Sequence, residues 1–212
     1  MQSNRDSALK VAEFLLQIKA VKLQPQKPFT WASGWKSPIY CDNRVTLSYP
    51  QIRTYIRQEY TRTILDEFGK PDAIAGVATG GIAQGALVAQ ELGIPFVYVR
   101  SSSKGHGMQN RVEGFLESGQ SVVVIEDLIS TGMSSLSAVE ALREAGAEVK
   151  GMVAIFTYGF DLSLSNFKKE KVILHTLSDY DTLVEQALKS EYIDEKETES
   201  LKKWREAPSK WG

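Results

Sequence analysis

The chain has 212 residues, 42% of them hydrophobic and 24% charged, which is the composition of an ordinary soluble globular protein. This length suits a single domain. The formal net charge of -1 argues against a bulk electrostatic nucleic-acid binder. The single cysteine, Cys41, excludes an internal disulfide framework, and no apolar run reaches the ~18 residues of a membrane-spanning helix. The N-terminus lacks the layout of a signal peptide. We therefore expect a cytoplasmic protein with neither nucleic acid nor membrane as a partner.

The first third of the chain combines two helical segments with an irregular one. Apolar spacing over residues 7–20 predicts an amphipathic helix. Residues 24–46 are rich in proline, tryptophan, serine and glycine, have no helical period, and indicate short strands joined by turns. Ser48 and Pro50 then suit the cap and the first turn of a helix that runs to Phe68 and ends at Gly69.

From residue 73 onward, short apolar runs alternate with helical patterns. The predicted helices cover residues 81–93 and 133–145, followed by two charged amphipathic helices within 181–206, to which we assign no function. The predicted strands are residues 73–78, 95–100, 121–127, 149–158 and 171–177. Continuous apolar runs indicate strands buried on both faces, as in a parallel sheet. The pattern predicts an open α/β sheet that binds its ligand at the carboxyl ends of the strands.

The segment Val122–Ser135 carries the clearest chemistry. Four apolar residues lead to Glu126 and Asp127, and a helix is expected to begin after the hydroxyl- and glycine-containing residues Ser130, Thr131, Gly132, Met133 and Ser134. A helix N-terminus with such side chains suits a phosphate. Two carboxylates repel a phosphate unless ribose hydroxyls or a magnesium ion intervene. The spacing therefore describes a sugar phosphate whose diol faces the acids, against the plainer alternative of a helix cap beside solvated acids.

Two further segments follow predicted strands. Thr79, Gly80 and Gly81 open a helix, and adjacent glycines allow a close approach of the backbone to a ligand or simply a tight turn. Residues 100–114 have no apolar periodicity and carry cations, which indicates either a closing loop over a phosphate-bearing ligand or a solvated basic hairpin. Its candidate ligand-binding residues are Arg100, Lys104 and His106, and Arg111 is a further cation.

These motifs, in this order, resemble those of the type I phosphoribosyltransferases. The segment Phe29–Arg44 (FTWASGWKSPIYCDNR), most simply core and turns on composition alone, is similar to the orotate-recognising segment of the orotate phosphoribosyltransferases. The loop with Lys104 and His106 resembles their mobile catalytic loop. The resemblance implies a single phosphoribosyltransferase domain over 1–212, with an open, mostly parallel sheet (about 70–180) flanked by helices. It also implies an N-terminal helix and small hood over about 1–46, and a mobile loop over 100–114.

The resemblance also implies roles for individual residues. Glu126 and Asp127 would bind the ribose diol and, with Lys104 and His106, form the catalytic set. The phosphoribosyl pyrophosphate (PRPP) site would add Arg100, Thr79, Gly80, Gly81, Leu128, Ile129, Ser130, Thr131, Gly132, Met133 and Ser134. Orotate would contact Lys36, the free backbone N–H groups at Ile39 and Tyr40, and Ser130. Magnesium (Mg²⁺) would be held mainly by PRPP and water near the two acids, with no certain protein ligand.

The chain departs from the family pattern at three places. Many members have lysines where this chain has Ala32 and Ser101, and some hold orotate with an arginine after the strand that ends here near Tyr158. Fewer positive charges are then left for pyrophosphate and orotate. Lys36 and Arg44 are candidates to compensate.

The implied activity is the magnesium-dependent transfer of ribose 5-phosphate from PRPP to N1 of orotate, by a homodimer whose loop reaches the neighbouring subunit. Two alternatives remain. A purine or uracil phosphoribosyltransferase would share the acidic strand and the phosphate loop. A regulator that binds PRPP without reacting would be expected to carry a DNA-reading module, which the sequence does not indicate. A fusion with a decarboxylase does not fit the length.

Overall fold

A six-stranded sheet forms the centre of the protein. The computed structural model describes residues 4–30, 34, 36–101, 111–208 and 211. The strand order is β10-β9-β8-β5-β6-β7, and all neighbours are parallel except β6 and β7. The strands are β5 (Ala73–Val77), β6 (Phe96–Val99), β7 (Val112–Glu113), β8 (Ser121–Ile129), β9 (Glu148–Thr157) and β10 (Leu174–Asp179). The predicted open, mostly parallel α/β sheet is confirmed.

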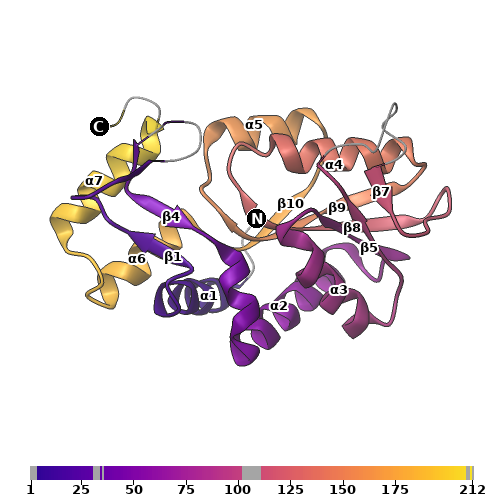
Figure 1. Cartoon of the computed structure of the whole chain (residues 1–212), viewed down its shortest axis with the longest axis horizontal. Coiled ribbons are helices and arrows are strands. Elements are labelled where there is room, and N and C mark those ends of the chain that lie inside the picture. The colour runs from indigo at the N-terminus through magenta and orange to yellow at the C-terminus, as the bar shows by residue number, and fades with distance from the viewer. Residues whose placement is uncertain (1–3, 31–33, 35, 102–110, 209–210, 212) are drawn as a thin grey trace.

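Helices cover both faces of this sheet (Figure 1). On one face lie α2 (Pro50–Phe68) and α3 (Gly80–Leu92), and on the other α4 (Met133–Glu144) and α5 (Asp161–Lys169). Alternate side chains of β8 serve the two layers: Val123 and Ile125 join the core beneath α2 and α3, whereas Val122 and Val124 join the core beneath α4. Burial on both faces explains the continuous apolar sequence of these strands.

The N-terminal segment and the last two helices lie at one end of the sheet (Figure 1). Here α1 (Arg5–Gln17) packs against α6 (Tyr180–Lys189) and β10, and α6 contacts α7 (Glu195–Glu206). We call residues 21–48 the hood. It contains β1 (Val21–Leu23), β2 (Phe29–Thr30), β3 (Lys36–Ser37), β4 (Ile39–Cys41) and the 3-10 helix η1 (Asn43–Ser48). Two antiparallel pairs, β1 with β4 and β2 with β3, shape it.

Several element boundaries differ from the sequence-based predictions. Ser48 does not cap α2: Tyr49 occupies the cap position, without a side-chain hydrogen bond, and Pro50 begins the helix. Strand β10 begins at Leu174 rather than at residue 171, because Lys171 and Val172 complete the turn that ends α5. Helix α5 was not predicted. It buries only Ser163 and Phe167, so its sequence lacks a clear apolar stripe.

No helix in the described ranges has both the length and the apolar character needed to cross a membrane.

Candidate active site

The loop after β8 runs directly into the N-terminus of α4. Gly132 adopts a left-handed φ of 80°, and a Cβ there would lie 2.6 Å from the Phe167 ring, so a side chain at this position is excluded on two grounds. Asn166 of α5 fixes the loop by donating from Nδ2 to the Thr131 carbonyl at 3.0 Å. No side-chain cap occupies the start of α4. Its first backbone N–H groups therefore suit an anion, as the sequence predicts.

The two acids at the end of β8 have different environments. Glu126 is buried, and its carboxylate accepts hydrogen bonds from the Asp127 N–H at 2.9 Å and from Ser135 Oγ at 2.8 Å. Burial raises the pKa of Glu126 well above its usual value, and a side-chain hydrogen bond with Asp127 and the charge of Asp127 raise it further. Asp127 is half-buried. Glu126 thus braces the start of α4, and Asp127 is the more accessible carboxylate of the pair.

The turn between β5 and α3 packs tightly against the end of β8. A Cβ at Gly80 would collide with the carboxyl group of Asp127, and one at Gly81 would collide with the Ile125 carbonyl. Thr79 caps α3 without a side-chain hydrogen bond, so backbone N–H groups are available at this helix start as well. The two glycines therefore have a packing reason to be small, and they bring a second helix N-terminus next to Asp127.

The base of the predicted loop 100–114 is an antiparallel pairing of β6 with β7. Arg111 is 7% exposed; its Nε donates to the Arg100 carbonyl at 3.0 Å and its Nη1 to Ser137 Oγ at 2.9 Å. This arginine fixes the loop base to α4. Arg100 is partly exposed and lies 3.4 Å from Glu113. Lys104 and His106 lie outside the described residues, so their predicted roles stay predictions.

The candidate orotate-binding residues of the hood differ in their exposure and in their hydrogen bonds. Lys36 is exposed, and its Nζ donates to Thr30 Oγ1 at 2.9 Å. Ile39 is fully buried, and its N–H points to Ser37 Oγ at 3.3 Å. The expected free N–H of Ile39 is therefore engaged in its own turn. Tyr40 is 40% exposed and contacts the Phe29 ring, which leaves an aromatic surface on this segment.

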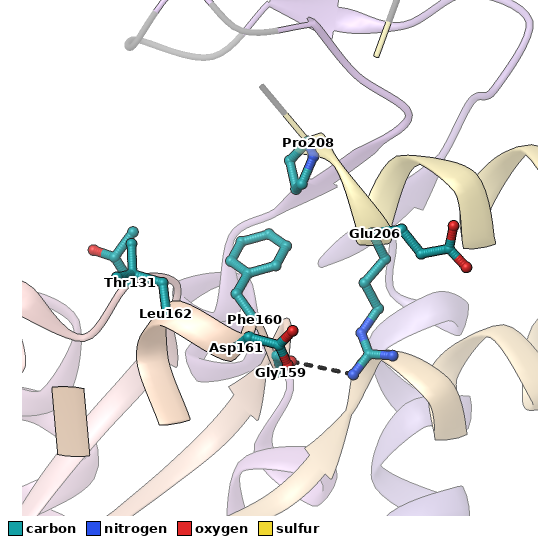
Figure 2. Close-up of a pocket in the computed structure, with 8 residues that line it drawn as sticks. Thr131, Gly159, Phe160, Asp161, Leu162, Glu206 and Pro208 are labelled. Atoms are coloured by element: carbon teal, nitrogen blue, oxygen red, sulfur yellow. Dashed lines mark hydrogen bonds between the residues drawn. The ribbon is translucent and has the colours of Figure 1, made fainter. Parts of the chain in front are cut away.

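A pocket of about 350 Å³ lies between the predicted phosphate loop (residues 128–134), the turn after β9 and the end of α7. In Figure 2 the Phe160 ring stands between Thr131 and Glu206, and the dashed line marks the bond from Arg205 Nη2 to the Gly159 carbonyl. Arg205 also donates from Nε to the Tyr158 carbonyl at 3.1 Å. The C-terminal helix, to which the sequence assigned no function, thus fixes a turn that borders the phosphate loop.

A model of the phosphoribosyl transferase domain matches residues 50–190. An orotate phosphoribosyltransferase from Porphyromonas gingivalis is 60% identical over 202 residues, which cover 95% of this chain and 96% of that protein. The chain belongs to the orotate phosphoribosyltransferase family. The resemblance drawn from residues 29–44, 100–114 and 122–135 is confirmed at the level of the family and its enzyme class, a pentosyltransferase.

Solved structures of the family share this architecture. An orotate phosphoribosyltransferase from Aeropyrum pernix is 28% identical with a TM-score of 0.71, over 83% of this chain and 98% of that one. The UMP synthase of Leishmania donovani is 27% identical with a TM-score of 0.80. This chain covers 95% of its own length in that match but spans only 43% of the synthase chain.

Three residues around the site were not anticipated from the sequence. Asn43 and Tyr60 bind the backbone carbonyls of Asp127 and Glu126, at 2.6 Å and 2.5 Å. Ser135 binds the Glu126 carboxylate, although it lies only one position beyond the predicted phosphate-binding residues. Asn43 lies between Asp42 and Arg44 in the sequence, and Tyr60 lies between Glu59 and Thr61, so no local pattern sets either residue apart from its polar neighbours.

The compensation for missing cations by Lys36 and Arg44 stays a prediction, because the Arg44 guanidinium is paired with Asp42. Arg44 is exposed, and it forms two hydrogen bonds with the Asp42 carboxylate, 2.7 Å from Nε and 2.9 Å from Nη2. This pairing lowers the pKa of Asp42. Ser101 is exposed, and Ala32 lies outside the described residues.

Proposed function

We propose that the chain transfers ribose 5-phosphate from PRPP to N1 of orotate, releasing orotidine 5′-phosphate and pyrophosphate, a step of de novo pyrimidine biosynthesis. The observation that carries the proposal is the convergence of Asp127, the loop 128–134 and the turn 78–81 at the carboxyl end of the sheet. Membership of the orotate phosphoribosyltransferase family supports the identity of the base.

The phosphates of PRPP bind at two helix starts in this proposal. The loop Leu128, Ile129, Ser130, Thr131, Gly132, Met133 and Ser134 receives the 5-phosphate at the N-terminus of α4. Thr79, Gly80 and Gly81 receive the pyrophosphate at the N-terminus of α3. Unpaired N–H groups and the helix dipole favour anions at both places. Arg100, Lys104 and His106 add positive charge over the pyrophosphate.

Asp127 binds the ribose diol in this proposal, and Glu126 holds it in place. The carboxylate of Glu126 is already engaged by Ser135 and by the Asp127 N–H, whereas that of Asp127 is half-exposed. The bond from C1 of the ribose to pyrophosphate stretches early and leaves positive charge on the ring. A carboxylate fixed beside the ring stabilises that charge without having to reorganise.

Orotate lies on the opposite face of the ribose, between the hood and the phosphate loop. Lys36, the segment Ile39–Tyr40 and Ser130 are the proposed contacts. Orotate is already an anion, so the reaction needs no strong general base. The site's main tasks are to orient N1 toward C1 and to neutralise the leaving pyrophosphate. His106 is the proposed proton donor to that leaving group.

Magnesium is the proposed metal ion. A hard cation that takes oxygen ligands and retains water suits the half-exposed Asp127 carboxylate beside the two phosphate sites. Asp127 would hold it, largely through water and the substrate's own oxygens. When bound, the ion would supply positive charge that offsets the negative charge of the leaving pyrophosphate. Glu126 fits less well, because both of its carboxylate oxygens accept hydrogen bonds from the protein.

We also propose that the protein is a homodimer in which each loop reaches the neighbouring subunit, and that it is located in the cytoplasm. Both are supported by the family resemblance. A purine or uracil phosphoribosyltransferase is the main alternative, and the 60% identity to an orotate phosphoribosyltransferase favours orotate over it. The same similarity to a named enzyme favours catalysis over a purely regulatory PRPP-binding role.

The test is to follow the ultraviolet absorbance of orotate with PRPP and magnesium. We expect orotate to be consumed, consumption to stop with a chelator, and Asp127→Asn to lose activity far more than thermal stability. An inactive wild-type protein would overturn the proposed reaction. If the Asp127→Asn variant is unfolded, the role of Asp127 is structural rather than in substrate binding.

A further inference from the structure

Asn43 connects the hood to the acidic pair. Its side chain is 1% exposed, and its Nδ2 donates to the Asp127 carbonyl at 2.6 Å across 84 residues of sequence. Its Oδ1 accepts from Cys41 Sγ at 3.4 Å. Burial raises the pKa of the Cys41 thiol, and the negative charge of Asp127 raises it further, so the thiol keeps its proton and remains a donor. Both ends of the Asn43 amide are therefore used.

The carbonyl that Asn43 binds lies beyond the ladder between β5 and β8. The last paired residues of that ladder are Gly76 and Ile125, two positions before Asp127. A backbone carbonyl that is shielded from water needs a donor, and the donor to this part-buried carbonyl comes from a side chain of the hood. The preceding carbonyl, that of Glu126, is bound by Tyr60 Oη from α2. The backbone of the acidic pair is therefore held at consecutive positions by two separate elements.

Asn43 is itself held firmly in the hood. The Asp42 N–H donates to the Ala20 carbonyl at 2.8 Å, next to the β1–β4 pairing. The Asn43 carbonyl accepts from Thr46 Oγ1 at 2.6 Å, and Thr46 Oγ1 in turn accepts from Gln84 of α3 at 3.2 Å. The backbone at Asp42 and Asn43 is thus held next to β1 and, through Thr46, to α3, so the Asn43 side chain transmits the position of the hood to the residue that it binds.

We infer that Asn43 is a positioning residue for the transferase reaction, which holds the backbone of Asp127 from the hood and so ties the pyrimidine-binding segment to the ribose-binding acid. The inference rests on the proposed function for the roles of Tyr40 and Asp127. Tyr40 precedes Asn43 by three residues, and the part-buried hydrogen bond from Asn43 to Asp127 joins the hood to β8. The two substrates then meet at a distance set by the protein rather than by each substrate separately.

The test compares variants of Asn43, Cys41 and Ser37 with the wild-type protein in two-substrate steady-state kinetics. Asn43→Asp keeps the size of the side chain and its acceptor for Cys41 but removes the donor to Asp127, and Asn43→Ala removes both. We expect both variants to raise KM for PRPP by about tenfold to a hundredfold and to lower kcat, because the Asp127 carbonyl loses its donor and the backbone of Asp127 is no longer held. Cys41→Ala keeps the bond to Asp127, and we expect its kinetics to stay within about twofold of the wild type.

A second readout does not depend on turnover. PRPP with magnesium should raise the Tm of the wild-type protein and of Cys41→Ala by similar amounts, and raise that of Asn43→Asp much less.

A Ser37→Ala variant is a further kinetic control. It disturbs the hood turn at Ile39 without touching Asp127, so it should change KM for orotate and leave KM for PRPP nearly unchanged.

Three outcomes would overturn the inference. The first is a normal KM for PRPP in folded Asn43→Asp. The second is an equal loss of activity in Cys41→Ala and Asn43→Asp. The third is a kinetic profile of Ser37→Ala that matches that of Asn43→Asp. If the wild-type protein fails to consume orotate, the proposed reaction is wrong. The PRPP-induced Tm shift then still tests whether Asn43 positions Asp127. Should Asn43→Ala fail to fold, the isosteric Asn43→Asp gives the result.

Discussion

The carboxyl group of Asp127 lies directly over the Cα of Gly80, where a methyl group would collide with it. Asp127 follows the buried part of β8, and Gly80 begins α3. The contact brings the candidate ribose-binding acid against the candidate pyrophosphate turn. Gly80 has no left-handed φ, so its backbone conformation does not require glycine. Glycine is required at position 80 because a larger residue would collide with the Asp127 carboxyl group.

Gly80→Ala should therefore damage activity more than stability. Alanine suits the start of a helix, so the free energy of unfolding should change by less than about 1 kcal/mol, while the displaced Asp127 carboxylate should lower kcat/KM for PRPP by about a hundredfold. Steady-state kinetics and urea denaturation measure the two effects. Gly93→Ala at the other end of α3 is the matched control: its left-handed φ of 63° predicts a loss of stability with normal kinetics. Normal kinetics in Gly80→Ala would refute the steric assignment.

Glu126→Gln should become progressively more stable than the wild-type protein as the pH rises. Burial and then Asp127 raise the pKa of Glu126, so between its ordinary pKa and the raised value the folded state holds a proton that the unfolded state has lost. Wild-type stability then falls with rising pH through this range, and glutamine removes that dependence while still accepting from Ser135. Urea denaturation from about pH 5 to about pH 8 measures it. Parallel stability curves for the two proteins would contradict a raised pKa.

Arg205→Ala should loosen the turn after β9. The guanidinium donates to the carbonyls of Tyr158 and Gly159, both at 3.1 Å, and its removal should destabilise the protein by about 1–3 kcal/mol. Asp181→Asn removes only the exposed ion pair at 3.2 Å, so it should change stability by less than about 1 kcal/mol. Denaturant unfolding of both variants makes the comparison. An equal effect would show that the ion pair, rather than the carbonyl contacts, matters.

Lys104→Ala should collapse turnover while the fold stays intact. Lys104 lies outside the described residues, so this prediction rests on the loop motif and family membership. Removing a cation that stabilises the leaving pyrophosphate should raise the activation barrier by about 3 kcal/mol, roughly a hundredfold in kcat. Lys189→Ala, an exposed lysine of α6, should leave kcat unchanged. Near-normal turnover of Lys104→Ala at unchanged Tm would remove this lysine from catalysis.

Local sequence patterns were sufficient to predict the strand, turn and helix that contain the candidate site residues 126–134. The apolar run of β8, the acids that end it and the glycine before α4 are contiguous, so their arrangement follows from strand, turn and helix geometry. The residues that hold these acids, and the turn after β9, in place come from far along the chain. Asn43 is separated from Asp127 by 84 positions, Tyr60 from Glu126 by 66, and Arg205 from Gly159 by 46. No local period encodes such contacts, because they arise only when the hood, α2 and the C-terminal helix pack against the sheet.

The most direct test of the central claim is a competition among bases. The purified protein is mixed with PRPP, magnesium and equimolar orotate, uracil, adenine, hypoxanthine and guanine, and the nucleotides formed are resolved by mass. We predict orotidine 5′-phosphate as the dominant product, accompanied by pyrophosphate and abolished by a chelator. A purine or uridine nucleotide as the main product would contradict the assignment of residues 29–44 to orotate while leaving the PRPP site in place.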